Sequence, residues 1–331
     1  VRGAPSCVDD LLTEMMARGL NIANWAPGEL ERLANSTILW DLERYMEWYS
    51  RLPELARREI EEGPFGYIEA LFRYSTENPK LLETLDRWQS SLITTIDDMQ
   101  ISNGSEAKNQ VNRAYNALKN IYSGLNQWDV FYSAKSAFLA LRVPGLCGWG
   151  APPGNIMTVE RNGKRYLVIP GMFYGNVFVG PQPQRGWEGD VDKLYHSQIV
   201  PPHHQYLAFY AYLQTEFGAD AMIHLGRHGT YEWLPRKESA LSGADYPDIC
   251  LGGIPSIYIY IMDGVGEVIH AKRRGLAVSI SHLTPPLEAT EIYGDIASLK
   301  TLIDQYHSAP GNRAEEIRLI REKAVQLHLD T

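Results

Sequence analysis

The chain has 331 residues, 44% of them hydrophobic, and a formal net charge of −9. This length and composition predict a globular protein with one large or two smaller domains and exclude a disordered chain. The acidic balance argues against nucleic-acid binding, and no window of about 18 apolar residues predicts a membrane span. Cys7, Cys147 and Cys250 are too few and too far apart for a disulfide framework or a zinc finger, which fits a reducing cytoplasm.

Residues 6 to about 140 are predicted to be helical, because apolar residues recur there at helical spacing. The expected helices cover residues 7–20, 29–33, 42–49, 54–62, 68–74, 79–100, 106–122 and 128–142. A stripe of large apolar side chains in the sixth helix predicts core packing along the seam of a helical bundle. The stripe consists of Leu81, Leu85, Trp88, Leu92, Ile96 and Met99.

The pattern changes at Pro144, after which short strand-like segments alternate with helices. A turn-rich stretch, 145–154, precedes a hairpin whose strands, 156–159 and 166–169, flank Asn162-Gly163. Residues 175–183 predict a short buried strand and a loop. The remaining elements are strands at 221–225, 249–251, 257–262 and 277–281, helices at 207–217, 267–274, 292–306 and 313–328, and a loop at 229–241.

This order of elements predicts an α/β protein with an α+β tendency. A helical N-terminal region is followed by a layered α/β domain with short, mostly parallel strands. We expect the helical region to cover residues 1–145 and the α/β core to cover residues 146–331. The functional loops of such a core lie beyond the carboxyl ends of its strands. Because the chain starts at Val1 and no signal-peptide pattern follows, we expect a segment of a longer polypeptide.

One stretch, GADAMIHLGRHGTYEWLP, has a dense set of chemically active side chains. His224, His228 and Glu232 follow an H-x-x-x-H-x-x-x-E spacing, and Gly226 and Gly229 argue against a continuous helix. We expect a strand that ends near His224 and a tight loop that contains His228. Two imidazoles and a carboxylate suit a divalent transition metal ion. A purely structural role is the alternative, and for His224 taken alone it is the favoured one.

Three further groups of residues are candidates for chemistry. His203 and His204 follow two prolines at an expected helix start, where the helix dipole favours neutral imidazoles. Glu188 and Asp190 lie in a Gly-Trp-Glu-Gly-Asp stretch. They either collect a metal ion or act as a base, and the alternative is a polar turn without a chemical role. A basic run, residues 272–274, either binds carboxylates of a ligand or forms a solvated helix face.

Eight ordered blocks together resemble the large subunit of the ATP-dependent tetrapyrrole metal chelatases. This family comprises the cobaltochelatase subunit CobN and the H subunit of magnesium chelatase. The resemblance is dense over about 150–295 and thin over about 60–145, so we interpret the latter helices as an insertion particular to this branch. The blocks are Trp25-Ala-Pro-Gly-Glu-Leu, Ile169-Pro-Gly171, Gly175-Asn-Val-Phe-Val-Gly-Pro-Gln-Pro183, Arg185-Gly-Trp-Glu-Gly-Asp190, Pro201-Pro-His-His204, His224-Leu-Gly-x-His-Gly-Thr-x-Glu-Trp-Leu-Pro235, Ala271-Lys-Arg-Arg274 and His282-Leu-Thr-Pro-Pro286.

The resemblance implies a cytoplasmic ligase that forms nitrogen–metal bonds and works only with AAA+ ATPase and integrin-like partner subunits. The sequence has no G-x-x-x-x-G-K-[ST] phosphate loop, which fits ATP hydrolysis on those partners. The implied reaction is insertion of Co²⁺ into a corrin-type tetrapyrrole, hydrogenobyrinic acid a,c-diamide, in cobalamin biosynthesis. The alternatives are Mg²⁺ insertion into protoporphyrin IX, a non-catalytic tetrapyrrole- or metal-binding module, and a stand-alone zinc hydrolase.

The resemblance also suggests roles for individual residues. The expected metal-binding residues are His224, His228, Glu232 and His203. The expected catalytic residues, which take the pyrrole protons or assist, are Glu188, Glu232 and His204. The expected tetrapyrrole-binding residues, through ring stacking or carboxylate pairing, are Trp187, Trp233, Arg273 and Arg274.

The chain departs from the family pattern at two places. Pro235-Arg236-Lys237 stands where the family usually has Pro-Gly-Lys, and Met262-Asp-Gly-Val-Gly-Glu267 stands where it usually has Asn-Asn-Pro-x-Glu. Both departures lie near the expected site and bear on which tetrapyrrole and which metal it accepts.

Overall fold

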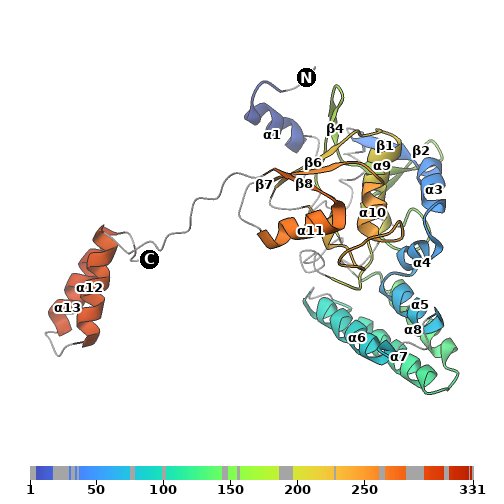
Figure 1. The fold of residues 1–331 in the computed structure, drawn as a ribbon, viewed down its shortest axis with the longest axis horizontal. Helices are drawn as coiled ribbons and strands as arrows, with labels where there is room; N and C mark the ends of the chain where they lie inside the picture. Colours follow the sequence, from blue (N-terminus) through green and yellow to red (C-terminus); the bar gives the residue numbers. More distant parts are fainter. Residues whose placement is uncertain are drawn as a thin grey trace. The chain divides into compact units, whose positions relative to one another are not determined.

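The fold is a mixed α/β structure with a helical N-terminal region, as the sequence predicts (Figure 1). The chain divides into two compact units, Val1–His282 and Leu283–Thr331. The structure, a computed structural model, describes residues 5–17, 30, 34–35, 37–74, 79–98, 102–143, 148–154, 157–185, 197–226, 229–260, 265–280, 294–308, 313–327 and 329.

Most of the predicted N-terminal helices are confirmed within one or two turns. They are α1 (Val8–Ala17), α3 (Leu42–Ser50), α4 (Glu54–Glu62), α5 (Pro64–Tyr74), α6 (Leu81–Asp98), α7 (Gly104–Tyr122) and α8 (Trp128–Ala140). The helix expected at 29–33 lies mostly outside the described residues. Residues 38–41, which the helical pattern missed, form a strand, β1 (Ile38–Asp41).

Helices α5 to α8 build an apolar core of their own (Figure 1). The predicted stripe on α6 is buried in it from Leu81 to Ile96, while Met99 lies outside the described residues. The indole of Trp88 is fully buried and donates a hydrogen bond to the carbonyl of Pro64, at 2.8 Å. Helical periodicity therefore identified this core correctly.

The same bundle buries one carboxylate and surrounds it with cations. Glu69 is 1% exposed and accepts hydrogen bonds from Arg58, Arg73 (2.9 Å), Lys135 (2.8 Å) and the hydroxyl of Tyr132 (2.8 Å). These donors come from α4, α5 and α8, so the ionic cluster ties three helices together. They lower the pKa of Glu69 even though burial alone would raise it.

Three small sheets follow, and most of their strand pairs are antiparallel. The first has the order β1, β3 (Lys164–Ile169), β2 (Thr158–Arg161). The second pairs β4 (Met172–Tyr174) with β5 (Val177–Val179). The third is parallel, in the order β6 (Met222–Gly226), β7 (Ser256–Tyr260), β8 (Val278–Ile280).

The expectation of mostly parallel strands is therefore wrong outside the third sheet. The predicted turn at Asn162-Gly163 is confirmed, and both residues have positive φ (53° and 74°), so β2 and β3 are joined by a tight turn that allows only antiparallel pairing. A two-residue turn likewise links β4 to β5. Parallel pairing occurs where α10 (Tyr246–Leu251) and α11 (Val265–Gly275) separate the strands in sequence.

Residues 249–251, expected to form a strand, are the end of α10. Helix signals explain the error. Asp245 occupies the N-cap, Pro247 lies in the first turn, and Gly252 follows in the left-handed conformation (φ 55°). The apolar run was too short for its period to distinguish a strand from a buried helix.

Helix α9 (His204–Thr215) is the centre of the α/β part and is buried along most of its length. It packs against α3, β3 and α10, so residues 38–60 share one apolar core with residues 167–277. Strand β1 crosses the boundary expected near residue 145 by pairing with β3. That boundary stays a prediction, since the compact units divide between His282 and Leu283.

The parallel sheet has two different faces. His224, Tyr258 and Ser279 are in register on the face that α10, α11 and a short 3-10 helix cover. The opposite face has two apolar rows, and Leu225 (75%) and Val278 (59%) are among its exposed residues. Strand alternation thus separates the polar candidate residues of this sheet from its open apolar face.

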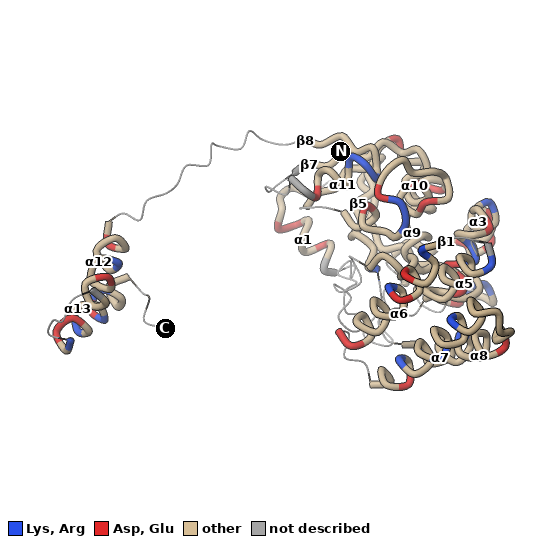
Figure 2. The backbone as a smooth tube through the Cα atoms, turned by 60° about the horizontal axis from the view of Figure 1, so that its bottom comes forward, with Lys and Arg blue, Asp and Glu red and all other residues tan. Residues whose placement is uncertain are grey.

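The second unit is a pair of helices, α12 (Gly294–Ser308) and α13 (Arg313–Gln326), which confirms two predicted elements. Lys323 bonds Asp295 across the pair, at 2.5 Å. Acidic and basic residues occur on both of these helices (Figure 2). No described helix is long and apolar enough to cross a membrane.

Candidate functional site

The candidate site lies where β6 ends and the 3-10 helix η3 (Tyr231–Trp233) begins. His224 is on β6, on the covered face of the sheet, and Glu232 is on η3 and fully buried. The predicted strand is therefore confirmed and ends at Gly226. His228, and with it the predicted turn, lies outside the described residues.

Tyr258 on β7 connects these two side chains. It is paired in register with His224, and the two rings are stacked with centroids 4.6 Å apart and planes 18° apart. Its hydroxyl donates a hydrogen bond to Oε2 of Glu232, at 2.8 Å. One tyrosine on the central strand of the sheet thus contacts both candidate residues.

Gly229 leaves the space in which these groups converge. A Cβ at this position would lie 2.6 Å from the Tyr258 hydroxyl and 3.1 Å from both Glu232 Oε2 and His224 Nδ1. Real Cβ atoms essentially never approach an oxygen at 2.6 Å. The imidazole, the carboxylate and the phenol therefore meet at a backbone position that has room only for glycine.

Burial sets the charge state of these groups. It lowers the pKa of His224 to about 4, so the imidazole is neutral at physiological pH. Its Nε2 is buried and has no hydrogen-bond partner among the described residues. Burial, with the nearby charge of Glu232, raises the pKa of Tyr258, which keeps its hydroxyl protonated as a donor. A neutral imidazole and a carboxylate held by a phenol form a donor set that suits a divalent cation.

The two histidines at the start of α9 differ in their hydrogen bonding. His203 caps the helix, and its Nδ1 accepts a hydrogen bond from the Tyr206 amide (3.2 Å), while its Nε2 is buried and meets no hydrogen-bonding criterion with any residue that the structure describes. Burial, reinforced by His204 and Arg185, lowers the pKa of His203 to about 3.

In His204 both ring nitrogens are occupied. Its Nε2 donates to the carbonyl of Gly150 (2.7 Å), so its Nδ1 accepts from the hydroxyl of Tyr45 (2.8 Å). This arrangement gives His204 a structural role between α9, α3 and residue 150, and no ring nitrogen remains for catalysis.

Arg185 links the start of α9 to η3. Its guanidinium donates to the carbonyl of Val200 (2.9 Å) and to the carbonyl of Trp233 (3.3 Å). Thr230, just before η3, bonds the hydroxyl of Tyr206 (2.6 Å) and the amide of Gln182 (2.8 Å). These contacts fix the segment that carries Glu232 against α9.

The residues predicted to bind the tetrapyrrole are placed differently from one another. Arg274 is 2% exposed and donates to the carbonyls of Leu234 (2.5 Å) and Pro235 (3.2 Å), so its guanidinium holds the chain after η3. Arg273 is exposed on α11. Trp233 lies against the ring of His270, with centroids 4.5 Å apart. Trp187 and Glu188 lie outside the described residues.

The structure brings together His224, Glu232 and the newly identified Tyr258, but a complete metal site is not assembled within the described residues. Among them, no three His, Cys, Asp or Glu side chains are grouped closely enough to hold a metal ion. The predicted ligand set includes His228, which is not among the described residues. No pattern in the sequence marks Tyr258 as part of the site, because its contacts depend on the register between β6 and β7.

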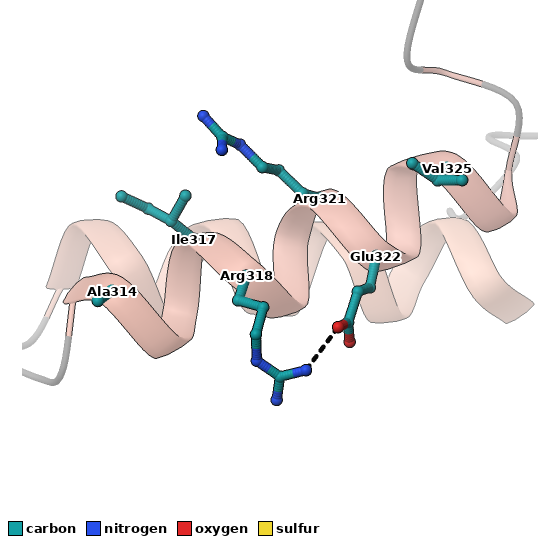
Figure 3. Close-up of a pocket in the computed structure, with 6 residues that line it drawn as sticks. All are labelled: Ala314, Ile317, Arg318, Arg321, Glu322 and Val325. Atoms are coloured by element: carbon teal, nitrogen blue, oxygen red, sulfur yellow. Dashed lines mark hydrogen bonds and ion pairs between the residues drawn. The ribbon is translucent and has the colours of Figure 1, made fainter.

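Two surface hollows are lined by other residues than those of this site. One, of about 520 Å³, is bordered by Arg236, which has φ 88°, pairs with Glu59 of α4 (2.8 Å) and lies over the ring of Tyr246. The other, of about 430 Å³, lies on α13, where Arg318 and Glu322 point toward each other and form an ion pair (Figure 3). In both, the acids and bases named here are paired with each other, and neither hollow contains His224 or Glu232.

Comparison with known proteins finds a family that covers the second half of the chain. The family described as CobN/Magnesium Chelatase matches residues 146–331. The aerobic cobaltochelatase subunit CobN of a Sinorhizobium species is 39% identical over 206 residues, 62% of this chain and 16% of its own length. The chloroplastic magnesium-chelatase subunit ChlH of Oryza sativa subsp. indica is 41% identical over 184 residues, 55% of this chain and 13% of its own.

An uncharacterized protein of Methanocaldococcus jannaschii is 44% identical over 168 residues, 51% of this chain and 13% of its own length. The catalytic subunit of cobaltochelatase from Mycobacterium tuberculosis matches in structure with a TM-score of 0.43 and 38% identity, over 55% of this chain and 16% of its own. The chain thus spans 13–16% of the length of these relatives. With more than half of its residues matched, including the whole candidate site, the chain belongs to the CobN/magnesium chelatase family.

Proposed function

We propose that this chain is a segment of the large subunit of a chelatase that inserts a divalent metal ion, its substrate, into a tetrapyrrole. The observation that carries the proposal is the convergence of His224, Glu232 and Tyr258 at Gly229 within the segment that matches the family. A neutral imidazole and a carboxylate can collect a hydrated cation and replace part of its water shell.

In the proposed reaction the inner N–H bonds of the ring break, their protons leave (one from a corrin-type ring, two from a porphyrin), and the metal ion binds to the ring nitrogens. His224 and Glu232 receive the ion, with His228 as a further ligand. Glu232 and Glu188 are the candidate bases for the pyrrole protons. His203, whose Nε2 has no hydrogen-bond partner, is proposed to assist, whereas His204 positions α9.

We propose Co²⁺ as the metal and a corrin-type ring, hydrogenobyrinic acid a,c-diamide, as its acceptor. Imidazole ligands suit cobalt, whereas Mg²⁺ prefers a site made only of oxygen atoms. Mg²⁺ insertion into protoporphyrin IX is the alternative within the family. ATP is hydrolysed by AAA+ partner subunits that act with an integrin-like subunit in the cytoplasm, and Trp187, Trp233 and Arg273 contact the ring.

The test is metal insertion by the full-length protein with its partner subunits and ATP. His228→Ala and Glu232→Ala are each expected to lower turnover at least 100-fold, while Glu238→Gln, on an exposed side chain nearby, serves as the control. Unchanged turnover in both variants would contradict the assignment. Comparing Co²⁺ with Mg²⁺ on each tetrapyrrole decides the branch, and ring binding without insertion would favour a non-catalytic module.

A further inference from the structure

We infer that Tyr258 is the positioning residue of this site, which fixes the Glu232 carboxylate through its hydroxyl and the His224 imidazole through its ring. The inference rests on the proposed function and adds a residue that neither the motif spacing nor the family blocks include. Tyr258 itself is not placed as a metal ligand, because its hydroxyl proton is donated to the carboxylate.

Tyr258 has a fixed place in the parallel sheet. It lies on β7, the central strand of the parallel sheet, between His224 on β6 and Ser279 on β8. Its side chain is 1% exposed. The backbone of β7 is therefore bonded on both sides, and the phenol has a fixed position from which to orient its neighbours.

The two contacts of Tyr258 act on different parts of the proposed donor set. The stacked ring, 4.6 Å from the imidazole, limits rotation of His224 about its side-chain bonds. The 2.8 Å hydrogen bond selects one orientation of the Glu232 carboxylate. Partners that orient a ligand in this way change metal affinity by about 10- to 100-fold when they are removed.

A second tyrosine in the same unit provides a matched control. Tyr246 is also fully buried, and its hydroxyl donates to a buried carboxylate, Glu59, at 2.6 Å. That carboxylate pairs with Arg236 rather than lying beside His224. Tyr246→Phe and Tyr258→Phe thus each remove one buried phenol–carboxylate hydrogen bond, but only the second touches the candidate site.

The experiment is a titration of the 331-residue chain with Co²⁺ alone, followed by the visible absorption of the bound ion, together with thermal unfolding. Tyr258→Phe is expected to raise the Kd for Co²⁺ by about 10- to 100-fold and to shift the absorption bands. Tyr246→Phe is expected to lower the unfolding temperature similarly while the Kd stays within threefold of wild type. Gly229→Ala, which displaces the Tyr258 hydroxyl without changing that residue, is a second variant and is expected to weaken Co²⁺ binding as well.

The outcomes separate the inference from the proposed function. If the wild-type chain binds Co²⁺ and Glu232→Gln abolishes binding, but Tyr258→Phe and Gly229→Ala bind as wild type, the inference is overturned and the proposed function stands. An equal loss of affinity in Tyr246→Phe also overturns it, because the effect would then be general destabilisation. No Co²⁺ binding by the wild-type chain refutes the metal site itself, and the inference with it.

Discussion

The helical bundle and the candidate site both bury polar groups, but they satisfy them differently. In the bundle, Glu69 is surrounded by three cations and a phenol, so its charge is compensated inside the protein. In the candidate site, Nε2 of His224 is buried without a hydrogen-bond partner in the described part of the chain, and the same holds for Nε2 of His203, at the start of α9. A buried polar group left in this state costs about 1–3 kcal/mol.

The two regions thus differ in whether the protein itself supplies partners for its buried polar groups. The bundle compensates its buried carboxylate with its own side chains and needs no ligand to do so. The region around η3 leaves a buried imidazole nitrogen without such a partner among the described residues, which is typical of sites that bind a ligand. This region lies inside the family match and the bundle outside it. Four predictions test this contrast.

The largest effect is expected from exchanging carboxylate for amide in the two regions. Glu69→Gln should lower the free energy of unfolding by about 2–4 kcal/mol, since it leaves buried cations uncompensated, although Arg73, 39% exposed, limits the loss. Glu232→Gln should instead raise the Kd for Co²⁺ at least 10-fold with a smaller loss of stability. Chemical denaturation and Co²⁺ titration of both variants measure this. Equal stability losses in the two variants would remove the contrast.

The second prediction concerns the loss of folding stability as the pH falls. Burial lowers the pKa of His224 from 6.5 to about 4, so its protonation favours the unfolded chain. Its stabilisation is complete above pH 6.5 and is lost as pH falls toward 4. His224→Phe, which keeps a stacked ring, should therefore reduce the stability lost between pH 7 and pH 5 by about 2 kcal/mol. Urea unfolding across this range checks it, and an unchanged pH dependence would show that folding does not lower the pKa of His224.

The third prediction uses the close approach at Gly229. Gly229→Ala places a methyl group 2.6 Å from the Tyr258 hydroxyl, so the phenol or the turn must move. We expect a loss of about 1–2 kcal/mol in the free energy of unfolding. Gly163→Ala, at a turn where a Cβ meets nothing within 4 Å, controls for the general effect of replacing glycine, with its own strain from φ 74°. A smaller loss of Co²⁺ affinity at 229 than at 163 would contradict the geometry.

The smallest effect is expected on the other face of the same strand. Leu225 neighbours His224 on β6 but is 75% exposed on the open face. Leu225→Lys should change the free energy of unfolding by less than about 0.5 kcal/mol and leave the Kd for Co²⁺ unaltered. Denaturation and titration again provide the measurement. A large change in either quantity would mean that this face is covered in solution.

The sequence predicted the parts of this protein that short-range rules determine. The stripe on α6 and the turn at Asn162-Gly163 depend on residues close in sequence, and both are confirmed. Strand β1 was missed because it exists through pairing of Ile38 with Ile169, far along the chain. The strand that carries His224 was predicted for the same local reason.

Long-range contacts determined the rest of the site. Nothing in the spacing shows that the two ring nitrogens of His204 are bonded to Tyr45 and Gly150, or that Arg274 binds backbone carbonyls. Residues that are chemically suitable for a ligand thus make hydrogen bonds within the protein instead. Tyr258, which no pattern marked, contacts both candidate side chains.

Arg236 limits which substitutions this sequence tolerates. Its φ of 88° lies in the region that suits glycine, and its side chain reaches Glu59 of α4, outside the family match. Arg236→Gly would relieve the backbone and at the same time leave Glu59 buried beside Tyr246 without its cation. The effect of either residue therefore depends on the other, which is epistasis. Exchanging segments with a relative that has glycine here would require replacing α4 as well.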